Sequence, residues 1–259
     1  MKNTTVFPLW DDPNSTKICF YEASDKRGDG TVVIFAGGGY KMRADYEESD
    51  YALRLNEFGL HVFTVDYRVA PDRFPLPLLD ARRAVRFVRK NAERFGIDPS
   101  KVAVMGSSAG GHLAALLSTY RAPIEGEGVD ETDTFDCSPD AEILCYPVIT
   151  LSEDHRHKWS AINLLGEREK ELAAALSPDL IADEKTPRTF LWHTANDELV
   201  PVKNSIRFVE RLTSLGVPVE YHIFPDGRHG LGLAKENPYV ARWTELLRGW
   251  LIANGWLEE

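Results

Sequence analysis

Short apolar runs alternate with longer amphipathic segments along the chain, a pattern typical of a mostly parallel sheet wrapped by helices. The apolar runs are rich in β-branched and aromatic residues and end at glycine, proline or polar residues, as buried strands do. We expect strands at 31–35, 61–66, 101–105, 143–146, 189–193 and 219–224, and residues 16–22 could form an early edge strand.

Amphipathic helices are expected between these strands. In segment 81–95, apolar residues recur at 81, 84, 85, 88, 92 and 95, which is the spacing of one helix face. Gly96 would end this helix. Further helices are expected at about 109–120, 205–215 and 239–251. The polar face of the first helix is basic and is expected to face solvent, and it contains Arg82, Arg83, Arg86, Arg89 and Lys90.

The elements follow one another without a repeat, a low-complexity segment or a linker rich in Pro, Gly or Ser. A chain of 259 residues is within the range of one α/β domain, so we expect a single domain over residues 1–259. Segment 148–187 has the weakest core pattern. We expect it to form a small lid within that domain.

Charge and cysteine content exclude several kinds of partner. The chain has 30 Lys and Arg against 40 Asp and Glu, and this net negative charge disfavours nucleic acid or an anionic membrane as the main partner. Its three cysteines match neither a disulfide framework nor a zinc pattern. No apolar run approaches the roughly 20 residues of a membrane helix, and the first residues lack the apolar core of a signal peptide. We therefore expect a cytoplasmic protein.

Residues 106–110 (GSSAG) match the pattern G-x-S-x-G, with Ser108 at its centre. The pattern alone is weak, because a glycine-rich turn without chemistry could produce it. Here, however, a predicted strand comes directly before it and a predicted helix directly after it. A nucleophile elbow requires those flanks, and its glycines allow the sharp turn on which the serine sits.

A serine hydroxyl needs a histidine base that is held by a carboxylate. In α/β-hydrolases the acid and then the histidine follow the serine along the chain. Asp197 lies beyond the strand ending at 193, where active-site groups collect, and its neighbour Glu198 is expected to be a solvated surface charge. Two histidines follow Asp197: His222 lies within an expected strand and is interpreted as structural, whereas His229 lies in a loop and is the expected base.

The third requirement is an oxyanion hole made of backbone N–H groups. Residues 37–39 are three glycines directly after the strand at 31–35, and they offer unhindered N–H groups at the right place. The N–H of Ala109, one residue past the serine, would add another donor. A phosphate-binding loop is the alternative, but neither of its usual glycine spacings is present.

Five motifs occur in an order that resembles a known family. They are GGGY (37–40), DYRVAPDRFPLPLLDARRAV (66–85), GIDPSKVAVMGSSAGGHLAALL (96–117), HTANDELVP (193–201) and FPDGRHG (224–230). The sequence resembles hormone-sensitive-lipase-like esterases and, more closely, their small bacterial acetyl-esterase and acetylxylan-esterase-like relatives. The resemblance implies an α/β-hydrolase fold with helices on both faces of the sheet and a small lid. It also implies Ser108 as nucleophile, Asp197 as acid and His229 as base, with oxyanion donors from Gly38, Gly39 and Ala109.

Two departures from the larger lipase-like members point to the smaller branch. Those members carry histidine where this chain has Ala36, and they carry an N-terminal cap for which this chain has no room. In the smaller branch, a segment like 157–166 (HKWSAINLLG) would cover the acyl or sugar pocket. The side chains expected to contact substrate are Tyr40, His157 and Trp159, with core packing or lid contacts as the alternative explanation.

Other polar residues are interpreted as structural. Arg68 and Asp80 are expected to form a polar pair, and the acidic and histidine residues near 154–157 match no strong metal-ligand spacing. We therefore expect neither a metal nor a cofactor. The C-terminal helix could mediate a homodimer through Trp243, Trp250 and Trp256, although covering the sheet is the simpler use of these side chains.

Together these features predict a serine carboxylesterase that hydrolyses short acyl esters, acetate first, through an acyl-enzyme. The natural substrate could be an acetylated sugar or xylo-oligosaccharide. A serine peptidase on the same fold and a catalytically inactive hydrolase-fold binding protein are the alternatives.

Overall fold

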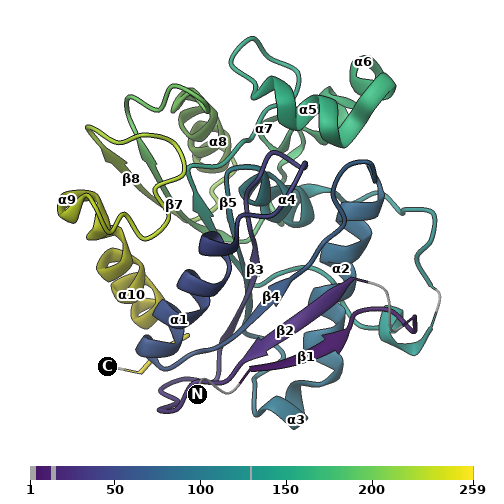
Figure 1. Ribbon diagram of the computed structural model, residues 1–259, viewed down its shortest axis with the longest axis vertical. Helices are drawn as coiled ribbons and strands as arrows, with labels where there is room; N and C mark the ends of the chain where they lie inside the picture. Colours follow the sequence, from purple (N-terminus) through teal and green to yellow (C-terminus); the bar gives the residue numbers. More distant parts are fainter. Residues whose placement is uncertain (1–3, 13–15, 129, 259) are drawn as a thin grey trace.

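An eight-stranded, mostly parallel sheet runs through the centre of the molecule (Figure 1). The computed structural model describes residues 4–12, 16–128 and 130–258. The strand order is β1-β2-β4-β3-β5-β6-β7-β8, in which β1 and β2 are antiparallel and β3 to β8 are parallel. This arrangement confirms the predicted fold class. The strands are β1 Thr4–Pro8, β2 Lys17–Tyr21, β3 Thr31–Phe35, β4 His61–Val65, β5 Val102–Ser107, β6 Ala141–Cys145, β7 Arg188–Thr194 and β8 Val219–Phe224.

Helices cover both faces of the sheet because its strands are apolar on both sides. The helices are α1 Ser49–Phe58, α2 Leu76–Lys90, α3 Ala92–Phe95, α4 Ser108–Thr119, α5 Lys158–Leu165, α6 Glu169–Leu172, α7 Pro178–Ile181, α8 Lys203–Ser214, α9 Pro238–Ala241 and α10 Trp243–Ala253. In β3, Val33 and Phe35 point into the cluster under α2, α4 and α8, whereas Val32 and Ile34 point into the cluster under α1 and α10. Short 3-10 turns are η1 Asp45–Glu47, η2 Glu131–Thr134, η3 Gly166–Arg168 and η4 Ala174–Leu176.

The antiparallel end of the sheet differs from the expectation. The strand expected at 16–22 forms as β2, but it pairs with β1 on one side and with β4 on the other, so it is not an edge strand. The edge is β1, which the pattern did not predict. Its side chains are mostly exposed, and a strand without a buried face leaves no alternating apolar signal.

Most of the basic face of α2 does not face solvent as expected, although Lys90 at the end of the helix is exposed. Arg82 is only 5% exposed and Arg83 only 3%. The acidic segment that follows α4 folds over this face, where Arg82 pairs with Glu127 at 2.9 Å and Arg83 pairs with Asp130 and with Asp133. Buried guanidinium groups need such partners, because an unpaired buried charge is costly.

Segment 148–187 lies over the carboxyl-terminal edge of the sheet, where α5, α6 and α7 sit above the strand ends (Figure 1). Two hydrogen bonds join this segment to the core. The Phe74 N–H donates to the Leu164 carbonyl at 2.9 Å, and the Asn163 side-chain amide donates to the Gly39 carbonyl at 2.8 Å. The segment is therefore attached to the turn after β3, and its action as a lid stays a prediction.

The C-terminal tryptophans cover the sheet. Trp243, Trp250 and Trp256 are buried, and Trp243 stacks on Trp192 of β7 with ring centroids 5.1 Å apart. Buried indoles cannot form a contact between subunits, so a homodimer through these side chains is not supported. None of the helices in the described ranges is long and apolar enough to cross a membrane.

Candidate active site

The elbow at Ser108 forms where β5 passes into α4 without an intervening loop. Ser108 has φ 52°, in the left-handed region that non-glycine residues rarely adopt. A Cβ on Gly106 would collide with the Gly110 carbonyl, and one on Gly110 would collide with the Phe35 carbonyl. Both glycines of the motif are therefore required by close backbone packing, as a nucleophile elbow demands.

Ser108, His229 and Asp197 form one hydrogen-bonded chain. The Ser108 Oγ lies 2.8 Å from His229 Nε2, and His229 Nδ1 lies 2.6 Å from Asp197 Oδ2. The three residues follow β5, β8 and β7, so they meet at the carboxyl-terminal edge of the sheet. The structure thus brings together the three residues that the sequence predicted.

The Asp197 carboxylate is buried but strongly hydrogen-bonded. Burial raises its pKa, but hydrogen bonds from His193 and His229 outweigh this effect and hold the pKa well below its ordinary value. The carboxylate is therefore ionised and can only accept. His229 must then carry its proton on Nδ1, which leaves Nε2 free to accept the Ser108 hydroxyl proton.

Sequence reasoning missed His193 as part of this site. Its Nε2 lies 3.3 Å from Asp197 Oδ2 and 2.9 Å from the Val200 carbonyl, while its Nδ1 lies 2.7 Å from Ser205 Oγ. Because both Nε2 partners are acceptors, Nε2 carries the proton and Nδ1 accepts from Ser205. The only sequence signal was its position as the last predicted residue of a strand that leads to Asp197.

The rejected alternatives lie away from this chain of hydrogen bonds. Glu198 is exposed, and His222 of β8 pairs with Glu220 at 2.8 Å. The exposure of Glu198 matches the expected surface charge, and the pairing of His222 within β8 matches its expected structural role.

The glycine turn after β3 runs beside the elbow. A Cβ on Gly37 would lie 3.1 Å from the Ser108 Cβ, and Gly38 and Gly39 have φ 130° and 64°. Within the described ranges, the N–H groups of Gly38 and Gly39 donate to no other protein group, whereas the Gly37 N–H donates to Glu47. Ala109 lies in the first turn of α4, where helix geometry leaves N–H groups without an intrahelical acceptor. The predicted oxyanion donors are therefore available beside Ser108.

Of the three predicted substrate contacts, the one assigned to Tyr40 is wrong. Its ring is fully buried, and its hydroxyl lies 2.7 Å from His112 Nδ1, so the side chain packs in the core beneath the turn. His157 lies against the turn, since a Cβ on Gly39 would be 3.8 Å from His157 Cε1. Trp159 on α5 is 63% exposed. The substrate contacts of His157 and Trp159 stay predictions.

The His157 side chain interacts electrostatically with the His229 imidazole. Burial lowers its pKa, and the nearby His229 lowers it further. Its Nδ1 lies 2.8 Å from Ser160 Oγ on α5. The neutral imidazole is therefore held between the lid segment and the glycine turn, with its ring fixed by Ser160.

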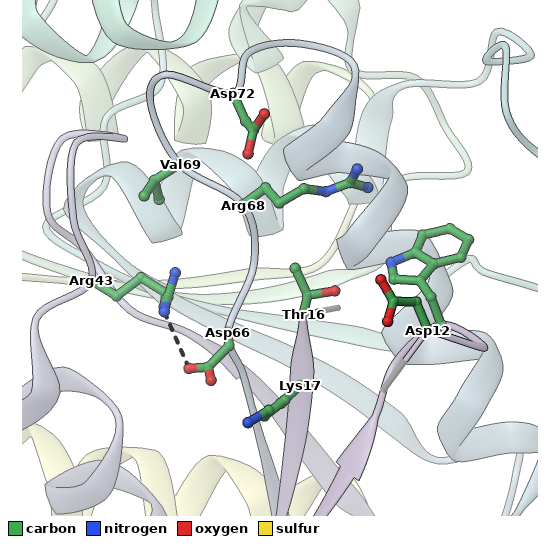
Figure 2. A pocket seen from close by; sticks show the side chains of 9 residues that line it. Asp12, Thr16, Lys17, Arg43, Asp66, Arg68, Val69 and Asp72 are labelled. Carbon is green, nitrogen blue, oxygen red and sulfur yellow. Dashed lines mark ion pairs between the residues drawn. The ribbon is translucent and has the colours of Figure 1, made fainter. Parts of the chain in front are cut away.

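A separate cavity of about 600 Å³ opens beside the ends of β2 and β4 (Figure 2). Charged side chains surround it, and two of them, Arg43 and Asp66, form an ion pair at 3.4 Å. A third, Arg68, lies 2.7 Å from Asp80, a buried residue that does not line the cavity. The second pair confirms the expected structural role of Arg68 and Asp80. Neither Ser108, Asp197 nor His229 lines this cavity. In the part of the chain that the structure describes, no cluster of His, Cys, Asp and Glu is arranged to hold a metal.

Comparison with known proteins identifies the relationship. A sequence model of the BD-FAE family matches residues 19–212. The acetylxylan esterase of Xylanibacter ruminicola is 31% identical over 94% of this chain and 49% of its own length. The endo-1,4-beta-xylanase B of Butyrivibrio fibrisolvens is 33% identical over 82% of this chain and 34% of its own. This chain thus spans only about a third to a half of these two curated relatives.

A solved structure matches over almost the whole length of both chains. The acetyl ester-xyloside bifunctional hydrolase from Caldicellulosiruptor lactoaceticus is 40% identical, with a TM-score of 0.91, and the match covers 98% of this chain and 97% of that one. The predicted relationship to acetylxylan-esterase-like proteins is therefore confirmed. The chain belongs to the BD-FAE family and has the α/β-hydrolase fold.

Proposed function

We propose that this chain is a serine carboxylesterase that removes short acyl groups, acetate first, through an acyl-enzyme. The observation that carries the proposal is the chain of hydrogen bonds from Ser108 through His229 to Asp197, with lengths of 2.8 and 2.6 Å. Such a chain activates a hydroxyl that is otherwise a poor nucleophile at neutral pH.

In the acylation step, Ser108 Oγ attacks the ester carbonyl while His229 Nε2 takes its proton. The carbonyl oxygen becomes an oxyanion, and the N–H groups of Gly38, Gly39 and Ala109 stabilise it. Removing one such donor typically costs about 100- to 1000-fold in rate. His229 then gives the proton to the departing alcohol oxygen, and Asp197 keeps the imidazole in the required tautomer throughout.

In the second step, His229 takes a proton from water as the water oxygen attacks the acyl carbonyl. The same N–H groups stabilise the second oxyanion. The acyl carbon–Oγ bond then breaks, the proton returns to Ser108, and the carboxylic acid leaves. No group other than water is needed to complete the reaction.

The proposed substrates are esters of acetylated sugars, including xylo-oligosaccharides. Two relatives support this choice, because their names associate them with acetylxylan and with acetyl ester-xylosides. The exposed indole of Trp159 on α5 offers a flat apolar surface of the kind that packs on a sugar ring. Segment 148–187 is small and attached to the core, which leaves little shelter for a long acyl chain.

Hydrolysis of p-nitrophenyl acetate by Ser108→Ala tests the chemical step. We expect an unchanged fold, measured by thermal unfolding, and loss of nearly all activity, on the order of 10⁴-fold or more. Comparable activity in this variant would refute the proposal.

A substrate panel tests the acyl and alcohol specificity. We expect kcat/KM to fall from p-nitrophenyl acetate through butyrate to octanoate, and acetylated xylo-oligosaccharides to release acetate. Trp159→Ala should raise KM for the acetylated oligosaccharide by about fivefold, equivalent to roughly 1 kcal/mol, and leave p-nitrophenyl acetate unaffected. Equal effects on both substrates would argue against a sugar contact.

A further inference from the structure

Glu47 is a buried carboxylate directly behind the glycine turn. It lies in η1 and is only 2% exposed. Its Oε2 accepts the Gly37 N–H at 2.7 Å, and its Oε1 accepts the Tyr146 hydroxyl at 2.6 Å. The carboxylate lies so close to the turn that a Cβ on Gly37 would collide with Oε2. Glu47 therefore fixes the start of the turn that carries the proposed oxyanion donors.

Tyr146 connects the same carboxylate to the loop of His229. Its hydroxyl accepts the Gly232 N–H at 2.9 Å, three residues past the histidine. Its ring meets the His229 imidazole edge to face, with centroids 5.2 Å apart. Tyr146 follows β6 directly and has φ 38°, a backbone conformation that is unusual for a tyrosine and that its contacts hold in place.

A third connection reaches the elbow. The Ser107 hydroxyl lies 2.9 Å from the Tyr51 hydroxyl, which lies 3.0 Å from the hydroxyl of Tyr146. With Glu47 ionised, every donor in this chain points toward it: Ser107 donates to Tyr51, Tyr51 to Tyr146, and Tyr146 to Glu47.

The backbone N–H groups of Gly37 and Gly232 fix the direction of two further hydrogen bonds. The N–H groups of Gly37 and Gly232 can only donate, so Glu47 Oε2 and the Tyr146 oxygen must accept. Hydrogen bonds to a charged acceptor are roughly twice as strong as neutral ones. Burial raises the pKa of Glu47, and the hydrogen bonds from Tyr146 and Gly37 oppose this effect.

We propose that Glu47 is a positioning residue for ester hydrolysis, which holds the oxyanion turn and the His229 loop in register with Ser108. The inference rests on the proposed function. Glu47 is hydrogen-bonded to the Gly37 N–H and the Tyr146 hydroxyl and to none of the proposed reacting atoms, and the neighbouring Tyr46 hydroxyl also stabilises its carboxylate. It acts by fixing the backbone on two sides of the nucleophile.

This role makes a specific kinetic prediction. The oxyanion exists only in the transition state and the tetrahedral intermediate, so a misplaced turn weakens binding of the transition state and not of the ester. Loss of Glu47 should therefore lower kcat and leave KM nearly unchanged. A change in stability alone would lower neither constant once the fraction of folded protein is measured.

The test compares Glu47→Ala, Glu47→Gln and Tyr146→Phe with wild type, using kcat and KM for p-nitrophenyl acetate and thermal unfolding. In Glu47→Ala the Gly37 N–H and the Tyr146 hydroxyl lose their acceptor, and kcat should fall about 100-fold with KM within threefold. In Glu47→Gln the amide oxygen can still accept from Gly37, so activity should recover to about tenfold below wild type. Tyr146→Phe keeps the ring against His229 but loses the links to Glu47 and Gly232, and should also lose about tenfold.

Glu142→Gln is the matched control. Glu142 is a fully buried carboxyl on β6 that accepts the Thr189 hydroxyl at 2.7 Å, with no contact to the glycine turn. This variant should keep kcat within twofold of wild type. If Glu47→Ala does not fold, Glu47→Gln and Tyr146→Phe decide the question.

Folded Glu47→Gln and Tyr146→Phe with kcat within twofold of wild type would overturn the inference, as would a raised KM at unchanged kcat. The Ser108→Ala variant separates the two proposals. If Ser108→Ala remains active, the proposed function fails whatever the Glu47 variants do. If Ser108→Ala is inactive and the Glu47 variants behave as wild type, only the role of Glu47 is refuted.

Discussion

At the scale of single residues, Asp197 is the most constrained side chain of the site. Its Oδ2 is shared by His229 and His193, and its Oδ1 accepts the backbone N–H groups of Leu199 and Val200, both at 2.9 Å. These donors orient the carboxylate before substrate arrives. The side chain can therefore hold the His229 tautomer without reorganising during the reaction.

Asp197→Asn tests this arrangement. An amide nitrogen in place of Oδ2 would face the two histidines as a donor, so His229 would no longer be held with its proton on Nδ1. We expect kcat for p-nitrophenyl acetate to fall by about 10³- to 10⁴-fold while the protein stays folded. The neighbouring exposed carboxylate gives the control, and Glu198→Gln should behave as wild type. A loss below tenfold in Asp197→Asn would contradict its role as the acid.

A second residue-scale prediction concerns His112, which bridges Tyr40 and the Leu176 carbonyl of η4. Burial lowers its pKa from 6.5 to about 4, although the bond to Leu176 opposes the shift. Below pH 6.5 the unfolded chain binds this proton more readily than the folded chain, so stability falls as pH drops.

The contribution of neutral His112 is therefore fully present above pH 6.5 and is lost between pH 6.5 and about 4. The loss amounts to a few kcal/mol, on the order of 3. Urea unfolding of wild type and His112→Gln across this window measures it. The difference between the two should shrink as pH falls, and a constant difference from pH 7 to 4 would show that His112 does not titrate there.

At the scale of elements, the basic face of α2 shows what periodicity can and cannot predict. The apolar spacing gave the correct core face, but the single helix expected over 81–95 is interrupted at Asn91 and forms as α2 and the short α3. The first of these is α2. It begins earlier than expected, at Leu76, since Pro77 is tolerated within a first helical turn. Periodicity does not say what covers the polar face. The acidic residues of the polar segment 125–139 were the available signal, because their charge is complementary to that of the arginines.

The same element gives a stability prediction. Arg83 is buried against the buried Asp133 carboxylate and the partly exposed Asp130, so Arg83→Ala leaves both with fewer partners. We expect a loss of about 3 kcal/mol in the free energy of unfolding, measured with urea. Lys90 on the same helix pairs with the exposed Glu131, and Lys90→Ala should cost less than about 1 kcal/mol. Equal losses would mean that the α2 pairs are not buried in solution.

At the scale of the whole molecule, the parallel core and the candidate triad could be predicted because their signals are local. Ser108 directly follows β5, and Asp197 and His229 lie in the loops just after β7 and β8, in the chain order typical of this fold. Other parts of the site left no local signal. Glu47 and Tyr146 lie 99 residues apart in the sequence, and their hydroxyl–carboxylate contact arises only when the sheet assembles. Tyr40 was misplaced for the same reason, because a ring next to the turn can point into the core.

The central claim is that the whole fold serves to activate one hydroxyl, that of Ser108. Labelling with a fluorophosphonate, followed by mass spectrometry of the intact protein and its peptides, measures this activation directly. We predict one adduct per chain, located on Ser108, with no adduct in Ser108→Ala and continued labelling in the control Glu142→Gln. An unlabelled wild type, or an adduct that persists in Ser108→Ala, would contradict the account.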